Sequence, residues 1–403
     1  MLPAAEGLSL QAFRRAQFAV VAAAGALAGI VLLGLPAGWR MPGLFALGML
    51  FGLTLYLTGF GFTAAYRELL VHRETGGVRA QLLLIAVTMI LFAPLLAAGS
   101  VLGREVVAAV APVGVAVAAG AFLFGIGMQL AGGCGSGTLY TLGGGSTRMA
   151  VVLVAFCAGS FIASFHMPWW GRLPGWGEVS LGAALGWPAA IALQLALLLV
   201  LWALLGRIGR RPRGDRLASP DRASRQRMLW VGAPVLALLS VLTLALAGHP
   251  WSITWAFSLW GAKTALLFGW DPAAADFWRG GFQSTALASG ILDDVTSVMD
   301  IGIVLGALAG AGAAGRFAPR LTLSGRTATA AVLGGLAMGY GARIAYGCNI
   351  GAFYSGVAST SLHGWLWIIA ALPGCWVGIR LRPWFDLDER SRPGAPPGYP
   401  LKS

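Results

Sequence analysis

The sequence predicts an all-α polytopic membrane protein with about ten spanning helices, re-entrant half-helices and two inverted repeats. Of its 403 residues, 57% are hydrophobic and only 11% are charged, and the mean hydropathy is +0.76. A soluble domain carries about 25% charged residues. Uncharged stretches such as 106–147 and 344–379 exceed the roughly 20 apolar residues that one spanning helix needs. A sequence motif recurs in the two halves of the chain, which predicts the repeats.

The apolar runs define the elements in order. They predict spans at 17–39, 43–62, 80–99, 111–131, 148–165, 180–206, 228–248, 297–314, 327–347 and 363–380. The first run is too long for a signal peptide and lacks a cleavage pattern, so we expect residues 1–42 to form an N-terminal extra helix. The stretch 251–290 is apolar but is interrupted by Lys263, Asp271 and Pro272, and we expect a re-entrant or interfacial segment there.

Arginine clusters predict the orientation in the membrane. Eight arginines lie in 207–227, and the positive-inside rule places such a loop in the cytoplasm. We therefore expect a first repeat at 43–206, a cytoplasmic linker at 207–227, a second repeat at 228–385 and a cytoplasmic tail at 386–403. Both termini then lie in the cytoplasm, as in a multi-pass protein of the plasma (inner) membrane. Because the net charge of +13 lies in loops and tails, we expect a lipid bilayer as partner and no nucleic acid.

The internal repeat has an offset of 214 residues, which is the separation of Cys134 and Cys348. The span before Cys134 and the span before Cys348 run in opposite directions, so the repeats are expected to be inverted, an arrangement common in transporters. The matched pairs are Gly120 and Gly334, Gly125 and Gly339, Gly127 and Gly341, Ala131 and Ala345, Gly133 and Gly347, Cys134 and Cys348, Gly137 and Gly351, and Tyr140 and Tyr354.

Two glycine-rich modules predict helix breaks. Irregular backbone at membrane depth persists only where it is buried in protein or lines a cavity. A break in 132–147 would free backbone N–H groups near Gly135, Ser136, Gly137 and Thr138, which together with the helix dipole favour an anion. The module 347–351 offers the same geometry from the other side. The expected pathway residues are Gly133, Cys134, Gly135, Ser136, Gly137, Thr138, Gly347, Cys348, Asn349 and Gly351. For glycines outside the modules we expect close helix packing.

The cysteines indicate a soft ligand. A neutral thiol is a weak donor and a polarisable contact that suits a sulfur atom better than a hard oxygen. Cys134 and Cys348 are equivalent in the two repeats, whereas Cys157 and Cys375 lie in apolar runs and are expected to be packing residues. No metal-ligand spacing, nucleotide-binding loop or serine triad is present. We therefore expect a transporter that needs no cofactor, and we do not expect an enzyme.

Two cations lie near the modules. Arg343 is in an apolar helix five residues before Cys348, where a charge is costly and is by default functional or paired. We expect it either to attract the anion or to pair with a carboxylate. The candidate carboxylates are Asp293, Asp294 and Asp300. Lys263 is expected to face the entrance of the pathway.

At these modules the sequence resembles the YeeE/YedE family of sulfur-compound membrane transporters. The resemblance rests on residues 130–140 and 339–351, with further matches at 62–68, 250–254 and 260–262, and it covers the chain from about residue 43. It implies uptake of a small sulfur-containing anion, thiosulfate, passed between thiols by S–H to sulfur hydrogen bonds in an hourglass-shaped protein. Cys134 and Cys348 would be the relay thiols. It also implies a cytoplasmic sulfurtransferase as a partner.

The sequence departs from the family pattern in ways that keep alternatives open. The family's third pathway cysteine aligns with Gly61, and its usual Arg and Glu align with Thr141 and Gly144. A pathway poorer in thiols and charge is also compatible with a transporter or channel for another small solute, such as a selenium species. A membrane thiol redox protein would need cysteines close enough to pair. A structural membrane subunit would tolerate loss of both cysteines.

Overall fold

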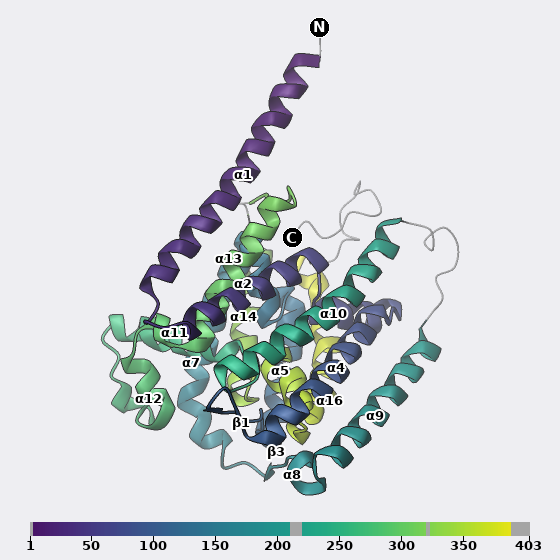
Figure 1. Cartoon of the computed structure of the whole chain (residues 1–403), viewed down its shortest axis with the longest axis vertical. Coiled ribbons are helices and arrows are strands. Elements are labelled where there is room, and N and C mark those ends of the chain that lie inside the picture. The colour runs from purple at the N-terminus through teal and green to yellow at the C-terminus, as the bar shows by residue number, and fades with distance from the viewer. Residues whose placement is uncertain (1–2, 210–219, 320–322, 388–403) are drawn as a thin grey trace.

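A computed structural model describes residues 3–209, 220–319 and 323–387. Its ten long helices each overlap one predicted span. They are α1 (Pro3–Gly34), α2 (Arg40–Thr58), α4 (Gly76–Ala98), α5 (Val115–Ala131), α7 (Thr147–Trp170), α9 (Trp187–Ile208), α10 (Pro220–Ala247), α13 (Val295–Ala313), α14 (Gly325–Ile344) and α16 (Leu362–Leu381) (Figure 1). The first starts further towards the N-terminus than predicted.

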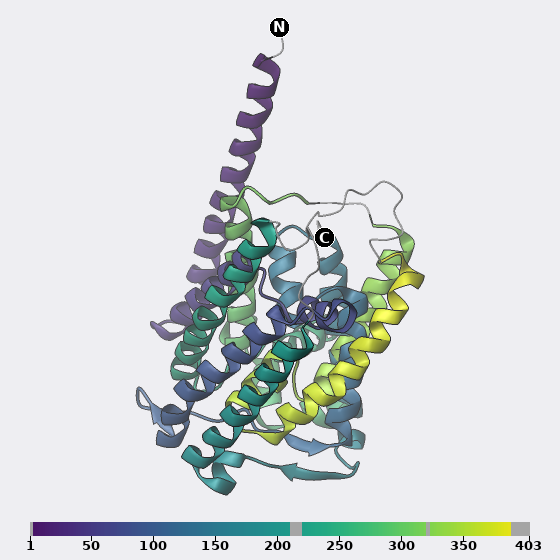
Figure 2. The same ribbon diagram turned by 90° about the vertical axis from the view of Figure 1, so that its right-hand side faces the viewer.

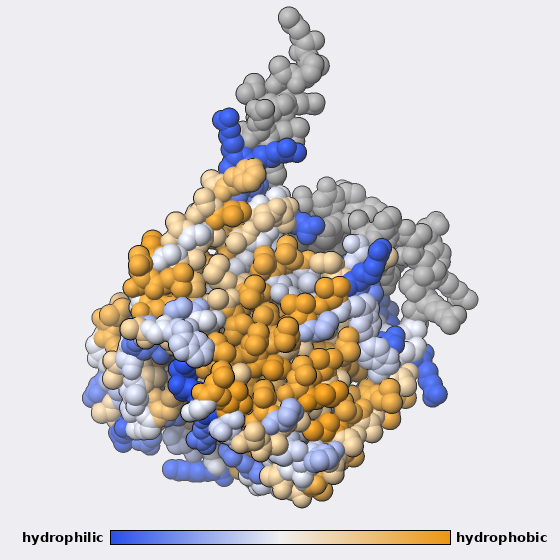
Figure 3. Space-filling view, in the orientation of Figure 1, coloured by the Kyte–Doolittle hydropathy of each residue, from blue (hydrophilic) through white to orange (hydrophobic). Residues whose placement is uncertain are grey.

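Nine segments of the described residues are long and apolar enough to cross a membrane, and they include every long helix except α14. Five glycines and two arginines lower the hydropathy of α14. One side of the molecule is a broad apolar face (Figure 3). Many large apolar side chains are exposed, among them Ile90 of α4 and Leu238 and Leu242 of α10. The protein is therefore an all-α, multi-pass membrane protein, as the sequence predicts.

Short elements connect the long helices. The helical ones are α3 (Phe62–Arg67), η1 (Glu68–His72), α6 (Gly135–Gly143), α8 (Leu181–Leu185), α11 (Thr254–Leu267), η3 (Pro272–Ala274), η4 (Asp276–Trp278), α12 (Gly281–Ala288), η5 (Ile291–Asp293), η6 (Asn349–Tyr354), α15 (Ser355–Ala358) and η7 (Arg382–Phe385). Strand β1 (Ser100–Val101) pairs antiparallel with β2 (Arg104–Glu105), and β3 (Pro112–Gly114) with β4 (Gly175–Glu178).

Two of these connections bear on the sequence-based boundaries. The apolar stretch 251–290 is divided into α11, η3, η4 and α12, and α11, the longest, has only 14 residues, too few to span a bilayer. The predicted span 180–206 is interrupted at Gly186, whose φ of 80° separates α8 from α9. That positive φ favours glycine and ends the short helix.

Glycines bring the two central helices, α5 and α14, into backbone contact. A Cβ atom on Gly120 would lie 2.6 Å from the carbonyl oxygen of Gly341, and one on Gly341 would lie 2.5 Å from that of Gly120. Gly127 and Gly334 have the same reciprocal relation, at 2.7 and 2.8 Å. Because one residue number falls as the other rises, the helices are antiparallel. The predicted packing role of these glycines is confirmed.

The neighbouring helices extend this arrangement. Gly125 of α5 packs on the backbone of α16 at Ala371, and Gly339 of α14 packs on the backbone of α7 at Phe156. Each central helix thus holds the helix that follows the module of the other half of the chain. Outside this centre, α1 projects beyond the other helices, and its inner part packs against Gly312 of α13 (Figure 2).

The helix pair α2–α13 gives a test of this packing. A Cβ atom on Gly306 of α13 would clash with the backbone of Met49 in α2. We therefore expect Gly306→Ala to lower the stability by about 1–3 kcal/mol, as overpacking of a close-packed interior does. Thermal unfolding in detergent measures the loss. Gly25→Ala is the control, because a Cβ there meets no atom within 4 Å; equal midpoints for the two variants would contradict the packing account.

Candidate functional site

The candidate site consists of two helix breaks, one in each half of the chain. Helix α5 ends at Ala131, Gly132 has a φ of 84°, and α6 begins at Gly135. Helix α14 ends at Ile344, and η6 begins at Asn349. The residue before each second helix is a cysteine, with φ and ψ of −91° and −166° at Cys134 and −99° and −164° at Cys348. Equivalent sequence positions therefore adopt nearly the same backbone conformation.

Both thiols are enclosed. Cys134 is 1% exposed and Cys348 is fully buried, and all four cysteines of the chain are free. The Sγ atom of Cys134 lies 3.4 Å from Oγ of Ser136, and Sγ of Cys348 accepts the N–H of Ile350 at 3.4 Å. Cys157 and Cys375 lie inside α7 and α16, away from the breaks.

The two breaks meet at Gly135. A Cβ atom on this residue would lie 3.2 Å from Sγ of Cys348, 3.5 Å from Cγ2 of Ile253 and 3.6 Å from Cγ2 of Thr254. A Cβ on Gly351 would lie 3.5 Å from Oγ of Ser252. The segment 252–254, which leads into α11, therefore lies against both breaks. A side chain at position 135 would therefore press against the Cys348 thiol, which favours glycine there.

One expectation about free backbone donors is wrong. The amide of Thr138 donates to the carbonyl of Cys134 at 2.8 Å and so makes the first i to i−4 hydrogen bond of α6. The hydroxyl of Thr138 donates to the same carbonyl, also at 2.8 Å. The amides of Gly135, Ser136 and Gly137 precede that bond at the helix N-terminus, where backbone N–H groups favour negative charge. In the second module the amide of Ala352 likewise donates to the carbonyl of Cys348, at 2.9 Å.

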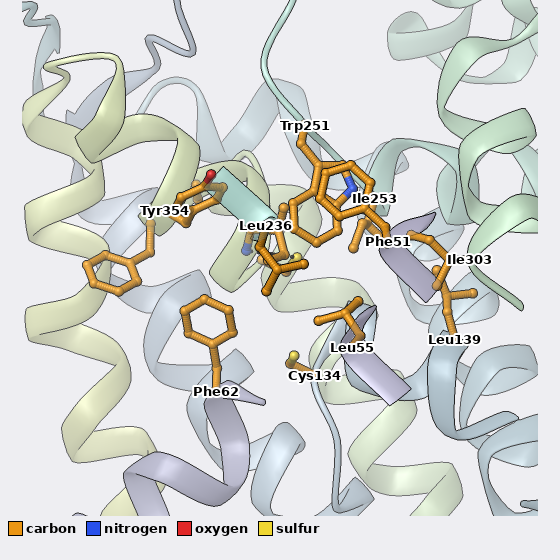
Figure 4. Close-up of a cluster of buried hydrophobic side chains, with 14 of the residues drawn as sticks. Phe51, Leu55, Phe62, Cys134, Leu139, Leu236, Trp251, Ile253, Ile303 and Tyr354 are labelled. Carbon is orange, nitrogen blue, oxygen red and sulfur yellow. Dashed lines mark hydrogen bonds between the residues drawn. The ribbon is translucent and has the colours of Figure 1, made fainter. Parts of the chain in front are cut away.

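Apolar and aromatic side chains form the walls of the site. The thiol of Cys134 is directed into a cluster that includes Leu55, Phe62 and Leu236 (Figure 4). Above them, the ring of Trp251 stacks on Phe51 with centroids 4.0 Å apart. The indole N–H of Trp251 is buried without a hydrogen-bond partner among the described residues. The reasoning from charge and cysteines missed this aromatic; its only sequence signal was the 250–254 match to the family pattern.

A hollow of about 250 Å³ lies beside Gly61, the position where the family pattern has a cysteine. Ala64, Glu68, Gly77 and Arg225 are among its lining residues. A Cβ atom on Gly61 would lie 3.2 Å from the hydroxyl oxygen of Tyr140, on the same helix that Cys134 precedes. Gly61 thus separates this hollow from α6.

The two predicted cations contact an aromatic ring and backbone carbonyls. Arg343 lies over the ring of Phe277, 5.1 Å from its centroid, and its buried Nε has no hydrogen-bond partner in the part of the chain that the structure describes. Among the described residues it forms no ion pair with Asp293, Asp294 or Asp300. Lys263 donates to the carbonyl oxygens of Leu287 at 2.9 Å and Ser289 at 2.5 Å. That ammonium group therefore ties α11 to the end of α12.

Arg148 has a structural role that sequence reasoning missed. Its Nη2 donates to the carbonyl of Leu130 at 2.5 Å, at the end of α5 just before the first break. A cation suits the C-terminal end of a helix, where the last carbonyls have no intrahelical partner. An arginine at the start of α7 thus holds the last turn of α5 in place.

Comparisons with known proteins agree with this architecture. The family described as sulphur transport matches residues 57–377. Over 357 residues, 82% of this chain and 95% of the relative, the chain is 28% identical to the thiosulfate transporter TsuA of Spirochaeta thermophila. Over 154 residues, 38% of this chain and 37% of the relative, it is 33% identical to the probable transporter YedE of Escherichia coli. This multi-pass membrane protein, with a free cysteine at each of two helix breaks, belongs to the sulphur-transport (YeeE/YedE) family.

Proposed function

We propose that this protein imports thiosulfate along a route lined by the two helix breaks. The observation that carries the proposal is the approach of Gly135 to the Cys348 thiol, which joins the break that bears one cysteine to the other cysteine. The family transports sulfur compounds, and a relative that matches most of the chain is named a thiosulfate transporter. The ten predicted pathway residues of the two modules would line this route.

The chemistry of the site supports a sulfur-bearing anion. Thiosulfate has a terminal sulfur that accepts a hydrogen bond from a neutral thiol, and both partners are soft and polarisable. The amides at the start of α6 favour its negative charge. The ion would leave one thiol for the next by exchange of hydrogen bonds, without a covalent intermediate. Because the walls of the site are apolar, the anion would be bound weakly and released readily.

Reciprocal contacts of α5 and α14 support a division into inverted repeats at 43–206 and 228–385. The contact of Gly120 with Gly341 is repeated by the contact of Gly127 with Gly334, its equivalent in the internal repeat, across an antiparallel helix pair. This reciprocity is expected for a two-fold relation with its axis in the membrane plane. Much of the linker 207–227 and nearly all of the tail 386–403 lie outside the described residues. We propose that the protein lies in the plasma (inner) membrane and that both of its termini are in the cytoplasm.

A cytoplasmic sulfurtransferase is the partner that we expect to consume the imported sulfur. The hollow beside Gly61 has the mixed charge of a partner-facing or water-filled mouth, with Glu68 and Arg225 in its lining. Removal of thiosulfate on that side would draw further anion through the route. The proposal for this partner rests on the family resemblance.

Counterflow into liposomes tests the substrate. Purified protein in liposomes loaded with unlabelled thiosulfate should take up radiolabelled thiosulfate, and protein-free liposomes should not. Selenosulfate should compete with the label, because selenium is as soft as sulfur. Sulfate has the same charge but lacks the terminal sulfur, so it should not compete at the same concentration. Equal competition by sulfate would rule out selection by the thiols, and preferential counterflow of a selenium anion would favour that alternative substrate.

A further inference from the structure

Asp300 is a carboxylic acid inside the spanning helix α13. The proposed route assigns no role to this residue. Helix α13 contains no other Asp and no Glu, Lys or Arg, and Asp300 is fully buried. Neither of its carboxyl oxygens has a hydrogen-bond partner among the described residues. An ionisable residue at membrane depth is costly and by default marks an ion or proton pathway.

Contacts one turn before and one turn after Asp300 show which way its side of α13 faces. Ser297 accepts a hydrogen bond from the indole N–H of Trp260 in α11, at 2.9 Å. Val304 lies against Gly143 of α6, where an added Cβ would clash with its backbone. Residues three and four apart share a helix face, so Asp300 faces the region of α11 and α6.

The other side of α13 is occupied differently. Met299 and Ile303 pack on Gly48 and Gly52 of α2 with their backbone atoms. Asp300 therefore does not face the lipid or the α2 interface. It faces α11 and α6, and α6 begins directly after Cys134 at the first break of the proposed route.

No cation compensates Asp300 within the described residues. Asp294, at the start of the same helix, accepts from the indole of Trp255 and the amide of Ser297. Lys263 and Arg343 are held by the carbonyls and the ring described above. The other titratable or charged groups on the described parts of the elements packed against α13 are Arg14 and Arg15 of α1, Arg40 and Tyr56 of α2, Tyr140 of α6 and Asp293 of η5. The neighbouring helix α7, which packs against α6 and α11, carries Arg148, Cys157 and His166. Arg40 donates to the carbonyls of Leu246 and Ala247, and Arg148 to that of Leu130.

These surroundings fit a neutral acid. An ionised carboxylate without a cation or a donor is far more costly in an apolar interior than a protonated carboxyl group. A protonated carboxyl group is therefore the form that suits this position. A residue that served only packing would not need a carboxyl group at this position.

We propose that Asp300 is the proton-binding site that couples anion import to entry of a proton. The inference rests on the transport function proposed above. The carboxyl group loses its proton, as COOH to COO⁻ and H⁺, when the route opens to water on the cytoplasmic side, and it binds one again from the outer side. One proton cancels one of the two negative charges of thiosulfate, which lowers the work of import into a cell with a negative interior.

An imposed pH gradient tests the coupling. In liposomes with the membrane potential clamped, wild type should accumulate labelled thiosulfate at least about tenfold better with an acidic exterior than without a gradient. Asp300→Asn should lose this gain but keep counterflow within about threefold of wild type, because asparagine mimics the protonated acid and exchange needs no net proton release. Asp300→Glu should restore part of the gain. Asp276→Asn is the control, because Asp276 is an exposed carboxylate paired with Arg279.

A second readout needs no substrate. Dicyclohexylcarbodiimide modifies protonated carboxyl groups in apolar surroundings, and mass spectrometry should find it on Asp300 of wild type, less at higher pH, and not on Asp300→Asn. Absence of this label would overturn the proton site. Proton coupling would be overturned if accumulation of labelled thiosulfate did not change with the pH gradient, or if it depended on a sodium gradient instead. Loss of counterflow in wild type with labelling intact would overturn only the thiosulfate assignment and would support the proton site.

Discussion

Cys348→Ala and Cys134→Ala are each expected to lower thiosulfate uptake by roughly 10- to 100-fold, because each removes a thiol that donates to the anion. A hydrogen bond to a charged group is worth about 1.5–3 kcal/mol, and about 1.4 kcal/mol corresponds to a tenfold change in rate. Both thiols are buried, so water cannot take their place easily. Uptake of radiolabelled thiosulfate by cells that lack other sulfate and thiosulfate importers measures the loss.

The matched control for these variants is Cys375→Ala. Cys375 is fully buried like Cys348 but lies inside α16 and not at a helix break. Its loss should leave uptake within about twofold of wild type once the rate is divided by the amount of inserted protein. Equal uptake by all three variants would contradict the relay and favour a route that the cysteines merely line, or a structural subunit that does not need them.

Gly135→Ala is expected to reduce uptake at least about tenfold while both thiols remain. The new methyl group would lie 3.2 Å from the Cys348 sulfur, closer than an ordinary contact, at the point where the two breaks meet and where the proposed route passes. Interiors of proteins are close-packed, so the surrounding helices cannot easily move apart to make room for it. Uptake and counterflow should fall together, whereas the unfolding midpoint should change by only a few degrees.

Two other glycines separate blockage from general damage. Gly351→Ala would add a methyl group at an ordinary distance, 3.5 Å from the Ser252 hydroxyl, and should reduce uptake less than Gly135→Ala. Gly206→Ala, on α9, adds a methyl group that meets nothing within 4 Å and should have no effect. If all three variants transported like wild type, the space beside Cys348 would not belong to the route.

The sequence predicted the fold well because membrane insertion imposes strong constraints. A span of about 20 apolar residues is visible without any knowledge of packing. The helix break in 132–147 was also visible, since so many glycines disfavour a lipid-facing helix. The break at 347–351 was expected from its match to the first module. The recurrence of Gly-Cys at a fixed offset singled out Cys134 and Cys348 among the four cysteines.

Partners of single side chains could not be predicted in the same way. Arg343 and Lys263 were selected because isolated charges are costly in a membrane, but composition does not show that a phenyl ring or two carbonyls lie within reach. The hydrogen bond from Arg148 to the end of α5 depends on how α6 and the turn after it bring the start of α7 back to the end of α5. Asp300 was visible in the sequence as a lone acid in an apolar run. The sequence analysis considered it only as a salt-bridge partner of Arg343.

Protection of the thiols by the anion tests the central claim most directly. Wild-type protein in membranes should be treated with methyl methanethiosulfonate, a small thiol reagent, and the modification rate of each cysteine followed by mass spectrometry. Thiosulfate should slow modification of Cys134 and Cys348 several-fold, sulfate should not, and neither anion should affect Cys375. If thiosulfate is transported while the modification rates of Cys134 and Cys348 are unchanged, the anion does not pass along these thiols and the relay is wrong.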